Sequence, residues 1–307
     1  MRSIKAVYKK HGIEYDTKTK KIFSPINGGM WICPPLVNGN HKIGKGAYHF
    51  STLPGNIEYH VNIAFTKKEK ICENKKSKKF GKLVKYTAID DVNPVFVDVK
   101  GTCVCTCTDE NGDISCYAFK GNYQYDTTIA YLAIRTILAR DYINFLERAI
   151  LAQIEVEKIE LCRIHAAGDF CSDEYAAMWK RIVAACKNTT IFWTYTKVKK
   201  YESLFDGDDN ANIVKSVING FGFNFGHCDY IMRVYKYLKS KGYKVHICFC
   251  GIEEYAGIEP RHCTECKSCS ECDFVLFIEH STKYKAHEDP LFPELVKLIL
   301  AQEEHKR

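Results

Sequence analysis

The sequence lacks three features that would define other classes of protein. No apolar run approaches the ~20 residues that a membrane-spanning helix needs, and the opening MRSIKAVYKKHG has no apolar core with a cleavage site after it. No internal repeat occurs, and the only low-complexity segment is a lysine-rich run. We therefore expect a globular, cytoplasmic protein with no membrane partner. Its 307 residues, of which 46% are apolar, can form one large domain or two small ones.

The sixteen cysteines are the most informative part of the composition. In a chain without an export signal they are difficult to explain as disulfides, because the cytosol keeps thiols reduced. Clustered cysteines in such a chain favour metal binding instead. The cysteines outside the clusters are expected only to pack as small apolar side chains; they are Cys33, Cys72, Cys162, Cys171, Cys186 and Cys228.

The net charge of +7 is unevenly spread, and much of it comes from TKKEKICENKKSKKFGKLVK at residues 66–85. Clustered lysines can neutralise the phosphates of a nucleic acid. The run has no arginine, however, and Phe80 is its only stacking aromatic. This composition favours a solvated lysine-rich loop, and nucleic-acid binding through Lys67 to Lys85 is the secondary hypothesis.

The chain divides near residue 95 into two parts. Residues 1–95 contain many turn signals and predict an irregular or β-rich section packed on the main domain. Residues 96–307 alternate between strand and helix patterns, with Ser172 as the expected N-cap of one helix. The predicted strands are 94–101, 159–165, 189–195, 212–220, 243–249 and 274–280. The predicted helices are 128–155, 172–187, a short one around 199–205, 228–242 and 293–305.

This alternation predicts an α/β fold with a parallel sheet, either open or curled into a full or partial (β/α) barrel. In such sheets ligands bind at the carboxyl ends of the strands. Unusual residues follow five of the predicted strands, so we expect them to meet at one mouth. They are the Cys103 group, Asp169, Thr196 with Lys197, Cys248 with Cys250, and Glu279 with His280.

A cysteine-rich segment, residues 248–272, ends in RHCTECKSCSECD. Its last four cysteines are spaced every third residue: Cys263, Cys266, Cys269 and Cys272. Zinc-binding CxxC pairs are usually separated by a dozen or more residues, whereas this run is closer to the CxxCxxC of bacterial ferredoxins. The pattern favours an iron-sulfur cluster first, and second a zinc site that recruits Cys248 or Cys250.

The other cysteine group is GTCVCTCTDENGDISCYAFKG, residues 101–121. If the segment is extended, the three cysteines at alternate positions face the same side, and the DENGD turn can bring the fourth cysteine back toward them. The alternative is a set of buried small side chains on a strand. Two sets of three ligands stay open: Cys103, Cys107 and Cys116, or Cys105, Cys107 and Cys116.

Three single residues are candidates for catalysis. Asp169 lies between a strand and a helix, where a carboxylate serves either a ligand or the helix N-terminus. His165 is either functional or a satisfied interior histidine. Lys197 follows a strand, and the alternative for it is a solvated loop lysine.

The order of these motifs resembles the phage gene product 88 domain family, over roughly residues 100–285. Members carry an R-x-H-x-(S/A)-GDF segment, a Y-x-YTK strand and a terminal cysteine cluster. The matching segments are CYA at 116–118, RIHAAGDFCSDEYAAMW at 163–179, IFWTYTK at 191–197, NFG at 224–226 and FIEH at 277–280.

The same order is similar to a second phage family, regarded as radical-SAM-like. That resemblance implies a partial (β/α) barrel whose first strand is followed by three cysteines that hold a [4Fe-4S] cluster, with one iron open to S-adenosylmethionine. It implies Tyr117 beside the cluster, and Gly168 and Asp169 at the cofactor's amino group. It implies cluster ligands among Cys103, Cys105, Cys107 and Cys116. The spacing departs from the common CxxxCxxC, because Glu110 stands three residues after Cys107.

Two functions follow from the sequence. The first is a radical S-adenosylmethionine-like enzyme with an unidentified substrate, in which the terminal cysteines hold an auxiliary cluster. The second is a metal-stabilised nucleic-acid-binding protein without radical chemistry, in which the basic run contacts phosphate. Cysteines at strand ends favour the first function, and the lysines favour the second.

Overall fold

The computed structural model of the chain describes most of its residues. The described residues are 3–39, 46–104, 116–119, 121–215, 218–219, 222–223, 225–249, 253–258, 266, 268–278 and 285–304. The helices are α1 (Ile4–Lys10), α2 (Asp126–Asp141), α3 (Ile143–Glu157), α4 (Asp173–Ala185), α5 (Cys228–Ser240), α6 (Glu253–Ala256) and α8 (Phe292–Glu304).

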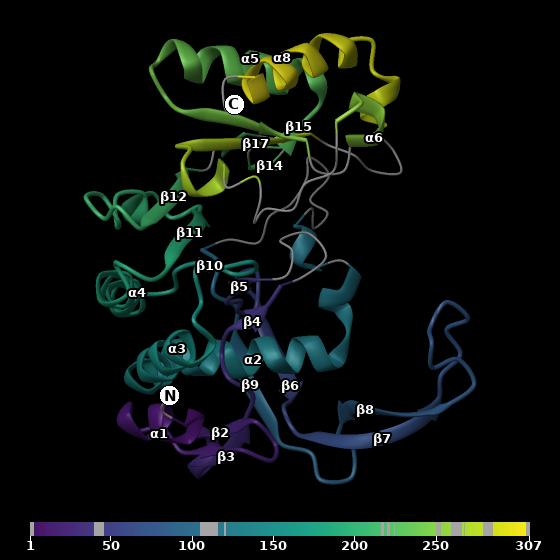
Figure 1. Ribbon diagram of the computed structural model, residues 1–307, viewed down its shortest axis with the longest axis vertical. Helices are drawn as coiled ribbons and strands as arrows, with labels where there is room; N and C mark the ends of the chain where they lie inside the picture. The colour runs from purple at the N-terminus through teal and green to yellow at the C-terminus, as the bar shows by residue number, and fades with distance from the viewer. Residues whose placement is uncertain are drawn as a thin grey trace.

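The strands belong to several sheets (Figure 1). Those before the first cysteine group are β1 (Tyr15–Asp16), β2 (Lys21–Ser24), β3 (Met30–Ile32), β4 (Val37–Asn38), β5 (Ala47–His49), β6 (Glu58–Asn62), β7 (Phe65–Ile71), β8 (Leu83–Ile89) and β9 (Phe96–Lys100). Those after it are β10 (Leu161–Arg163), β11 (Ile191–Thr196), β12 (Ala211–Lys215), β13 (Ile218–Asn219), β14 (Gly222–Phe223), β15 (Phe225–Gly226), β16 (Val245–Cys248) and β17 (Phe274–Ile278).

The central sheet has five strands in the order β12-β11-β10-β5-β4. Strands β5, β10, β11 and β12 run parallel, whereas β4 is antiparallel to β5. Cys162 on β10 is paired with Tyr48 on one side and with Phe192 on the other. Because the four parallel strands point the same way, the loops that follow them leave from one edge of the sheet.

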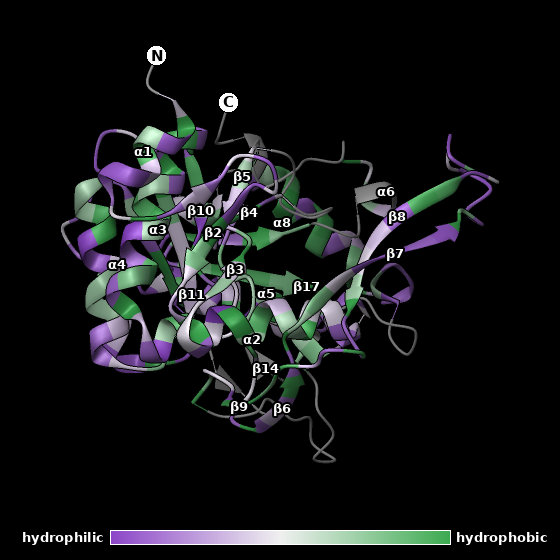
Figure 2. Ribbon diagram, turned by 90° about the horizontal axis from the view of Figure 1, so that it is seen from below, coloured by the Kyte–Doolittle hydropathy of each residue, from purple (hydrophilic) through white to green (hydrophobic). Residues whose placement is uncertain are grey.

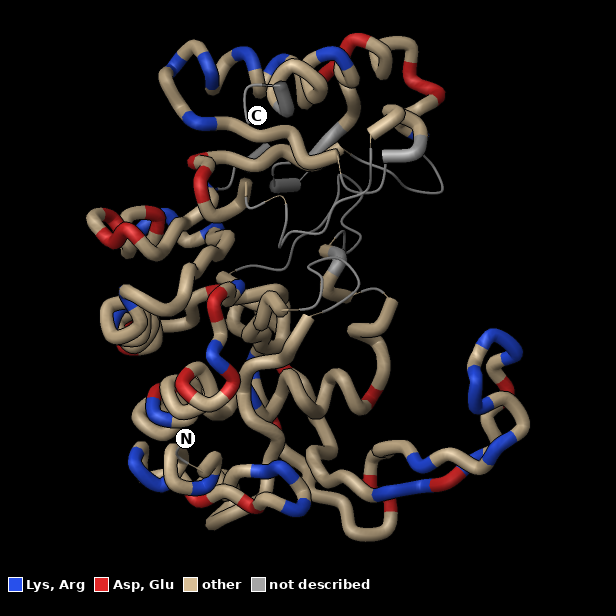
Figure 3. Tube along the Cα trace, viewed as in Figure 1, with Lys and Arg blue, Asp and Glu red and all other residues tan. Residues whose placement is uncertain are grey.

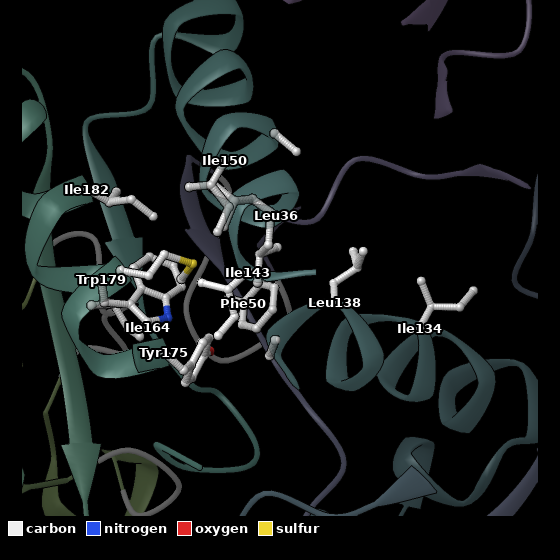
Figure 4. Packing of buried hydrophobic residues seen from close by; sticks show 14 of the residues in the cluster. Leu36, Phe50, Ile134, Leu138, Ile143, Ile150, Ile164, Tyr175, Trp179 and Ile182 are labelled. Carbon is white, nitrogen blue, oxygen red and sulfur yellow. The ribbon is translucent and has the colours of Figure 1, made fainter. Parts of the chain in front are cut away.

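One face of this sheet packs against α2, α3 and α4 (Figure 4). Successive side chains of a strand point to opposite faces, so Phe192 faces the helices while Trp193 faces away. The Trp179 ring lies 5.7 Å from that of Phe50 and 6.5 Å from that of Phe192. All three side chains are fully buried, and burying one side chain of this size contributes about 1.5–3 kcal/mol.

Helix α4 begins as its sequence predicts. The hydroxyl oxygen of Ser172 accepts a hydrogen bond from the backbone N–H of Tyr175 at 3.1 Å, which confirms Ser172 as the N-cap. Asp173 and Glu174 lie in the first turn, where negative charge is favourable. The cap fixes the start of α4 directly after the AAGDFC segment, so the segment between β10 and α4 is short.

A second, smaller parallel sheet has the order β15-β17-β16 and its own core with α5 and α8 (Figure 1). Ile247 on β16 pairs with Leu276 on β17, and both are fully buried. The two sheets are linked where the backbone N–H of Lys215, at the end of β12, donates to the carbonyl of Asp273 at 2.8 Å. Cys269 and Cys272 lie at this junction.

The predicted (β/α) barrel is wrong for the part of the chain that the structure describes. The strands form separate small sheets, and the central one is mixed. Strand β9, expected to begin the parallel series, pairs instead antiparallel with β6, from Glu58↔Lys100 to Asn62↔Phe96. A run of apolar residues indicates that a strand is buried but does not identify the strand beside it. In the parallel sheet the place beside β10 that was expected for β9 is taken by β5, which comes from the first 95 residues.

The lysine-rich run is a loop only in part, over the turn at residues 72–82, because its two ends are strands. Strands β7 and β8 pair in antiparallel register over seven residues, from Phe65↔Ile89 to Ile71↔Leu83, as a sheet of their own. Lysine and glutamate are poor strand formers, which is why the composition favoured a loop. No helix among the described residues is long and apolar enough to cross a membrane.

Candidate functional site

Asp169 connects the segments that follow β9, β10 and β11. Its backbone N–H donates to Thr102 Oγ1 at 3.0 Å, next to the first cysteine group. Its Oδ1 accepts from Thr196 Oγ1 at 2.8 Å, and its Oδ2 accepts from the backbone N–H of Lys197 at 2.9 Å. The carboxylate therefore joins the segment after β10 to the end of β11, and the backbone N–H joins it to the start of the cysteine loop.

The carboxyl group of Asp169 is deeply buried, with 3% of the residue exposed. Burial raises its pKa, while the hydrogen bonds from Lys197, Phe170 and Thr196 act in the opposite direction. Both oxygens already accept hydrogen bonds, so a ligand amine at this position would have to replace one of these donors. The role of Asp169 in cofactor binding stays a prediction.

Gly168 is required by close packing at the same point. Its φ is +85°, which glycine adopts without the cost paid by other residues. A Cβ atom here would overlap Thr52 Oγ1 and Thr102 Oγ1, which lie 2.8 Å apart in a buried hydrogen bond. Because Gly168 has no Cβ, Thr52 after β5 and Thr102 at the start of the cysteine loop can both pack against it. The three segments are therefore closely packed at this point.

His165 lies in the core rather than at an open mouth. It is 3% exposed, with Nε2 2.9 Å from Tyr175 Oη and Nδ1 3.5 Å from Thr194 Oγ1. Burial lowers its pKa to about 3, with a smaller effect from Arg163. The ring is therefore neutral at physiological pH. Its proposed catalytic role stays a prediction, since these contacts also explain a histidine that serves packing.

Lys197 contributes its backbone to the site through the bond to Asp169, and its residue is half-buried. Thr196, directly before it, is fully buried and also accepts a hydrogen bond from the backbone N–H of Val198. The TK pair, Thr196 at the end of β11 and Lys197 directly after it, thus holds the strand end in place. A catalytic role for the Lys197 amine stays a prediction.

The two described cysteines of the first group, Cys103 and Cys116, both act on Tyr59. Cys103 is buried, and its backbone N–H donates to the carbonyl of Gly55 at 3.2 Å. Burial raises the pKa of Tyr59, and the charges of Cys103 and Cys116 raise it further, so both sulfurs lie near the phenol. Tyr117 begins the short 3₁₀ helix Tyr117–Phe119. Cys105 and Cys107 lie outside the described residues.

The C-terminal cysteines converge on the opposite face of the central sheet. Cys269 Sγ lies 2.8 Å from Tyr195 Oη, and the amide of Asn212 donates to the carbonyls of Cys269 and Cys272 at 2.8 and 2.9 Å. Burial raises the pKa of Cys269, and the charges of Cys266 and Cys272 raise it further. Two of the four spaced cysteines, Cys269 and Cys272, are thus anchored on β11 and β12.

Strand β16 places a cysteine and a histidine, Cys248 and His246, near these cysteines. Cys248 raises the pKa of Tyr195, although less than burial and Cys269 do, so its sulfur also lies near the phenol. Cys266 Sγ lies 3.8 Å from His246 Nε2. His246 is one position that the sequence reasoning missed. Cys250, Cys263, Glu279 and His280 lie outside the described residues.

Arg163 and Tyr195 were also missed as site residues. The Arg163 guanidinium lies 5.0 Å from the centre of the Tyr195 ring, and its charge lowers the pKa of Cys269. The alternation of side chains along the strand could have identified them. Arg163 and Tyr195 lie on the same face of the sheet as Trp193, which is opposite to the helix-covered face of Phe192. Within the described ranges, no three histidine, cysteine or acidic side chains are arranged to hold one metal ion.

Comparisons with known proteins identify the family. The sequence model of the family described as Gene product 88 matches residues 63–219, which is half of the chain. The match includes the AAGDF segment and β11 but ends before the C-terminal cysteines, so it begins and ends earlier than the motifs suggested. Searches of curated proteins and of solved structures return no match. The radical-SAM-like motif order receives no support from these comparisons, and the chain belongs to the Gene product 88 family.

Proposed function

We propose that this protein is an iron-sulfur protein with radical S-adenosylmethionine-like chemistry on an unidentified substrate. The observation that carries the proposal is the anchoring of Cys269 and Cys272 by Asn212 at the junction of the two sheets, with Cys266 and Cys248 near enough for their charges to act on Cys269 and Tyr195. Thiolates are the ligands that iron-sulfur clusters and zinc select. The described donors therefore fit a thiolate-bound group in kind.

Two residues of the central sheet hold the turn that carries Cys269 and Cys272 in place. Asn212 orients the backbone of the cysteine turn, and Tyr195 offers a hydrogen bond to the Cys269 sulfur. Partners of this kind orient metal ligands and tune the bound centre. The Arg163 charge favours the thiolate form of Cys269, which is the form that binds metal.

The first cysteine group supplies the second part of the proposal. Cys103 and Cys116 lie near Tyr59, beside the unit formed by Thr102, Gly168 and Asp169. When bound, a [4Fe-4S] cluster supplies the single electron that reductive cleavage of S-adenosylmethionine requires. The buried hydrogen bonds of Asp169 would keep the cysteine loop at a fixed distance from β10 and β11.

Metal analysis tests this proposal. After anaerobic purification, we expect stoichiometric iron and sulfide, and an EPR signal of the reduced protein that changes when S-adenosylmethionine is added. Cys269→Ser should lose iron, whereas the exposed Cys33→Ser should keep it. Stoichiometric zinc with iron near zero would show that the C-terminal cysteines hold zinc. If the EPR signal of the reduced protein does not change when S-adenosylmethionine is added, the protein has an iron-sulfur cluster but does not use this cofactor.

We propose nucleic-acid binding as a second candidate function, one that needs no radical chemistry. The specific observation is the lysine-rich pair of strands β7 and β8, which extends away from the body of the protein (Figure 3). Its exposed lysines can neutralise phosphates, and such binding weakens as salt rises. Salt-dependent binding of labelled DNA or RNA tests this function, and a chain that binds neither does not have it.

A further inference from the structure

Residues 65–89 form a hairpin that we call the basic arm. It consists of β7, β8 and the turn between them, and it projects from the rest of the chain in two views (Figures 1 and 2). Among the strands that the structure describes, these two pair only with each other. A strand of seven residues spans about 24 Å at ~3.4 Å per residue, so the arm is a narrow two-stranded ribbon of substantial reach.

The base of the arm is fixed and its far end is not covered. At the base, the Phe65 ring stacks on Tyr131 of α2 at 4.4 Å, and the backbone N–H of Asp90 donates to the carbonyl of Ala64 at 3.0 Å. At the far end, Ile71 and Leu83 are 53% and 62% exposed. The scaffold therefore holds the arm in one direction while its distal surface remains open.

The arm carries the whole net charge of the protein. It contains nine lysines and two glutamates, a formal charge of +7, which equals the net charge of the entire chain. The other residues therefore sum to zero. A charge of one sign concentrated on a projecting element creates a strong local potential, which attracts a polyanion to this place rather than to the whole surface.

The lysines of the paired strands lie on both faces of the ribbon. On one face, Lys68 is opposite Tyr86, and the amine of Lys70 lies 5.1 Å from the Tyr86 ring. On the other face, Lys67 donates to Thr87 Oγ1 at 2.7 Å and Lys85 pairs with Glu69 at 3.3 Å. A flat lipid surface would contact only one of these faces, whereas the walls of a groove would contact both.

The turn holds the densest charge. Among the described residues, no carboxylate lies within salt-bridge distance of its five exposed lysines, which are Lys75, Lys76, Lys78, Lys79 and Lys82. Phe80 stands between them and is 52% exposed. The turn is nevertheless ordered by hydrogen bonds from Gly81 to Cys72 and from Cys72 to Lys82. It presents five charges and one aromatic ring at the end of the ribbon.

We propose that the basic arm enters the major groove of duplex DNA and binds its phosphates through the lysines of the turn. This inference rests on the proposed nucleic-acid binding and gives it a site and a ligand. The major groove of B-DNA, about 12 Å wide, admits a two-stranded β-ribbon without deformation, whereas the minor groove, about 6 Å wide, must be widened at a cost in free energy to admit one. Lysines on both faces of the ribbon then face the phosphates of both groove walls.

Fluorescence anisotropy with a labelled 20-bp DNA duplex tests the proposal on the full chain, between about 50 and 200 mM salt. The variant Lys75→Gln, Lys76→Gln, Lys78→Gln, Lys79→Gln removes four charges from the turn. We expect at least a tenfold loss of affinity. The slope of log K against log salt should fall by about 3–4, since each phosphate contact contributes about 0.9. Methyl green, a major-groove ligand, should compete with the protein, and the minor-groove ligand netropsin should not.

A matched variant changes the same charge elsewhere: Lys5→Gln, Lys9→Gln, Lys18→Gln, Lys236→Gln. It should keep the affinity within about twofold and leave the salt slope unchanged, because its lysines lie far from the arm in sequence and on other elements. Both variants change exposed or partly exposed side chains, so both should melt as the unmodified protein does. Circular dichroism checks this.

Several results would overturn the inference. An unchanged salt slope in the turn variant would show that the arm does not bind the phosphates. If the protein binds a 20-nucleotide single strand more tightly than the duplex, the arm does not bind in the major groove. Lysine-dependent binding to phosphatidylserine vesicles, without a change in DNA binding, would assign the arm to lipid. If the unmodified chain binds no nucleic acid at all, the second proposed function fails as well, whereas binding that survives the turn substitutions overturns only the role of the arm.

Discussion

The hydroxyl oxygen of Tyr195 lies 2.8 Å from the sulfur of Cys269, and the two residues come from a strand of the central sheet and from the C-terminal cysteine turn. The tyrosine is half-buried, and burial together with the nearby cysteines raises its pKa well above the ordinary value. A phenol that stays protonated donates its hydrogen to a metal-bound thiolate. Tyr195 is therefore a positioning residue for the proposed centre.

Tyr195→Phe should shift the reduction potential of the bound cluster to a more negative value, because hydrogen bonds to the sulfurs help to set that potential. The lost hydrogen bond should also lower the free energy of unfolding by about 1 kcal/mol. A redox titration followed by EPR measures the first effect. Tyr201→Phe, which removes a hydroxyl bonded to Asp173 on the surface, should leave the potential unchanged. Equal potentials in all three proteins would contradict the role of Tyr195.

Asp169→Asn should destabilise the fold by about 2–3 kcal/mol, because the amide places a donor where two backbone N–H groups and Thr196 already donate. Urea denaturation measures this. Asp206→Asn, on an exposed residue, should change the stability by less than about 0.5 kcal/mol. If both variants are equally stable, the carboxylate does not hold the strand ends together.

Gly168→Ala separates backbone strain from packing. The alanine must adopt a φ near +85° and its Cβ must displace Thr52 and Thr102, so we expect a loss of about 3 kcal/mol or more. Gly207 has nearly the same φ, +88°, but nothing within 4 Å of a Cβ. Gly207→Ala should therefore cost only the strain, about 1–2 kcal/mol. Equal melting temperatures for the two variants would show that the close approach at Gly168 is not important.

The histidines predict how stability depends on pH. Burial lowers the pKa of His165 and of His49 to about 3 in the folded protein, so between about pH 6.5 and pH 3 the unfolded chain binds two protons that the native state does not. Stability should be complete above about pH 7 and fall on acidification, by up to ~1.4 kcal/mol per pH unit for each histidine.

His165→Asn should remove one of these two contributions, and asparagine also tolerates the positive φ of 53° at this position. Urea midpoints at pH 7.5, 6.5 and 5.5 measure the slope. The variant should be less stable at pH 7.5, since the bond to Tyr175 is lost, but its stability should change less with pH. His60→Asn, on an exposed side chain, serves as the control. A variant slope equal to that of the unmodified protein would contradict the assignment.

Much of the local structure could be predicted from the sequence. The strand at Ile191–Thr196, the helix capped by Ser172 and the placement of Asp169 and Lys197 after strands all follow from side-chain periodicity and capping, which are properties of neighbouring residues. The motifs also indicated the Gene product 88 family, although its matched span reaches back to residue 63.

The tertiary structure decided which segments meet. Periodicity reports that β9 is a strand but not that its partner is β6, and hydrogen-bonded pairing across the chain placed β5 beside β10. The same limit hid Arg163 and His246, because their importance depends on Tyr195 and Cys266 from distant segments. The sequence by itself determined the cysteine spacing, the positive charge and the local elements. Only long-range pairing, which no local pattern encodes, placed the C-terminal cysteines on β11 and β12 and extended the lysines as a ribbon.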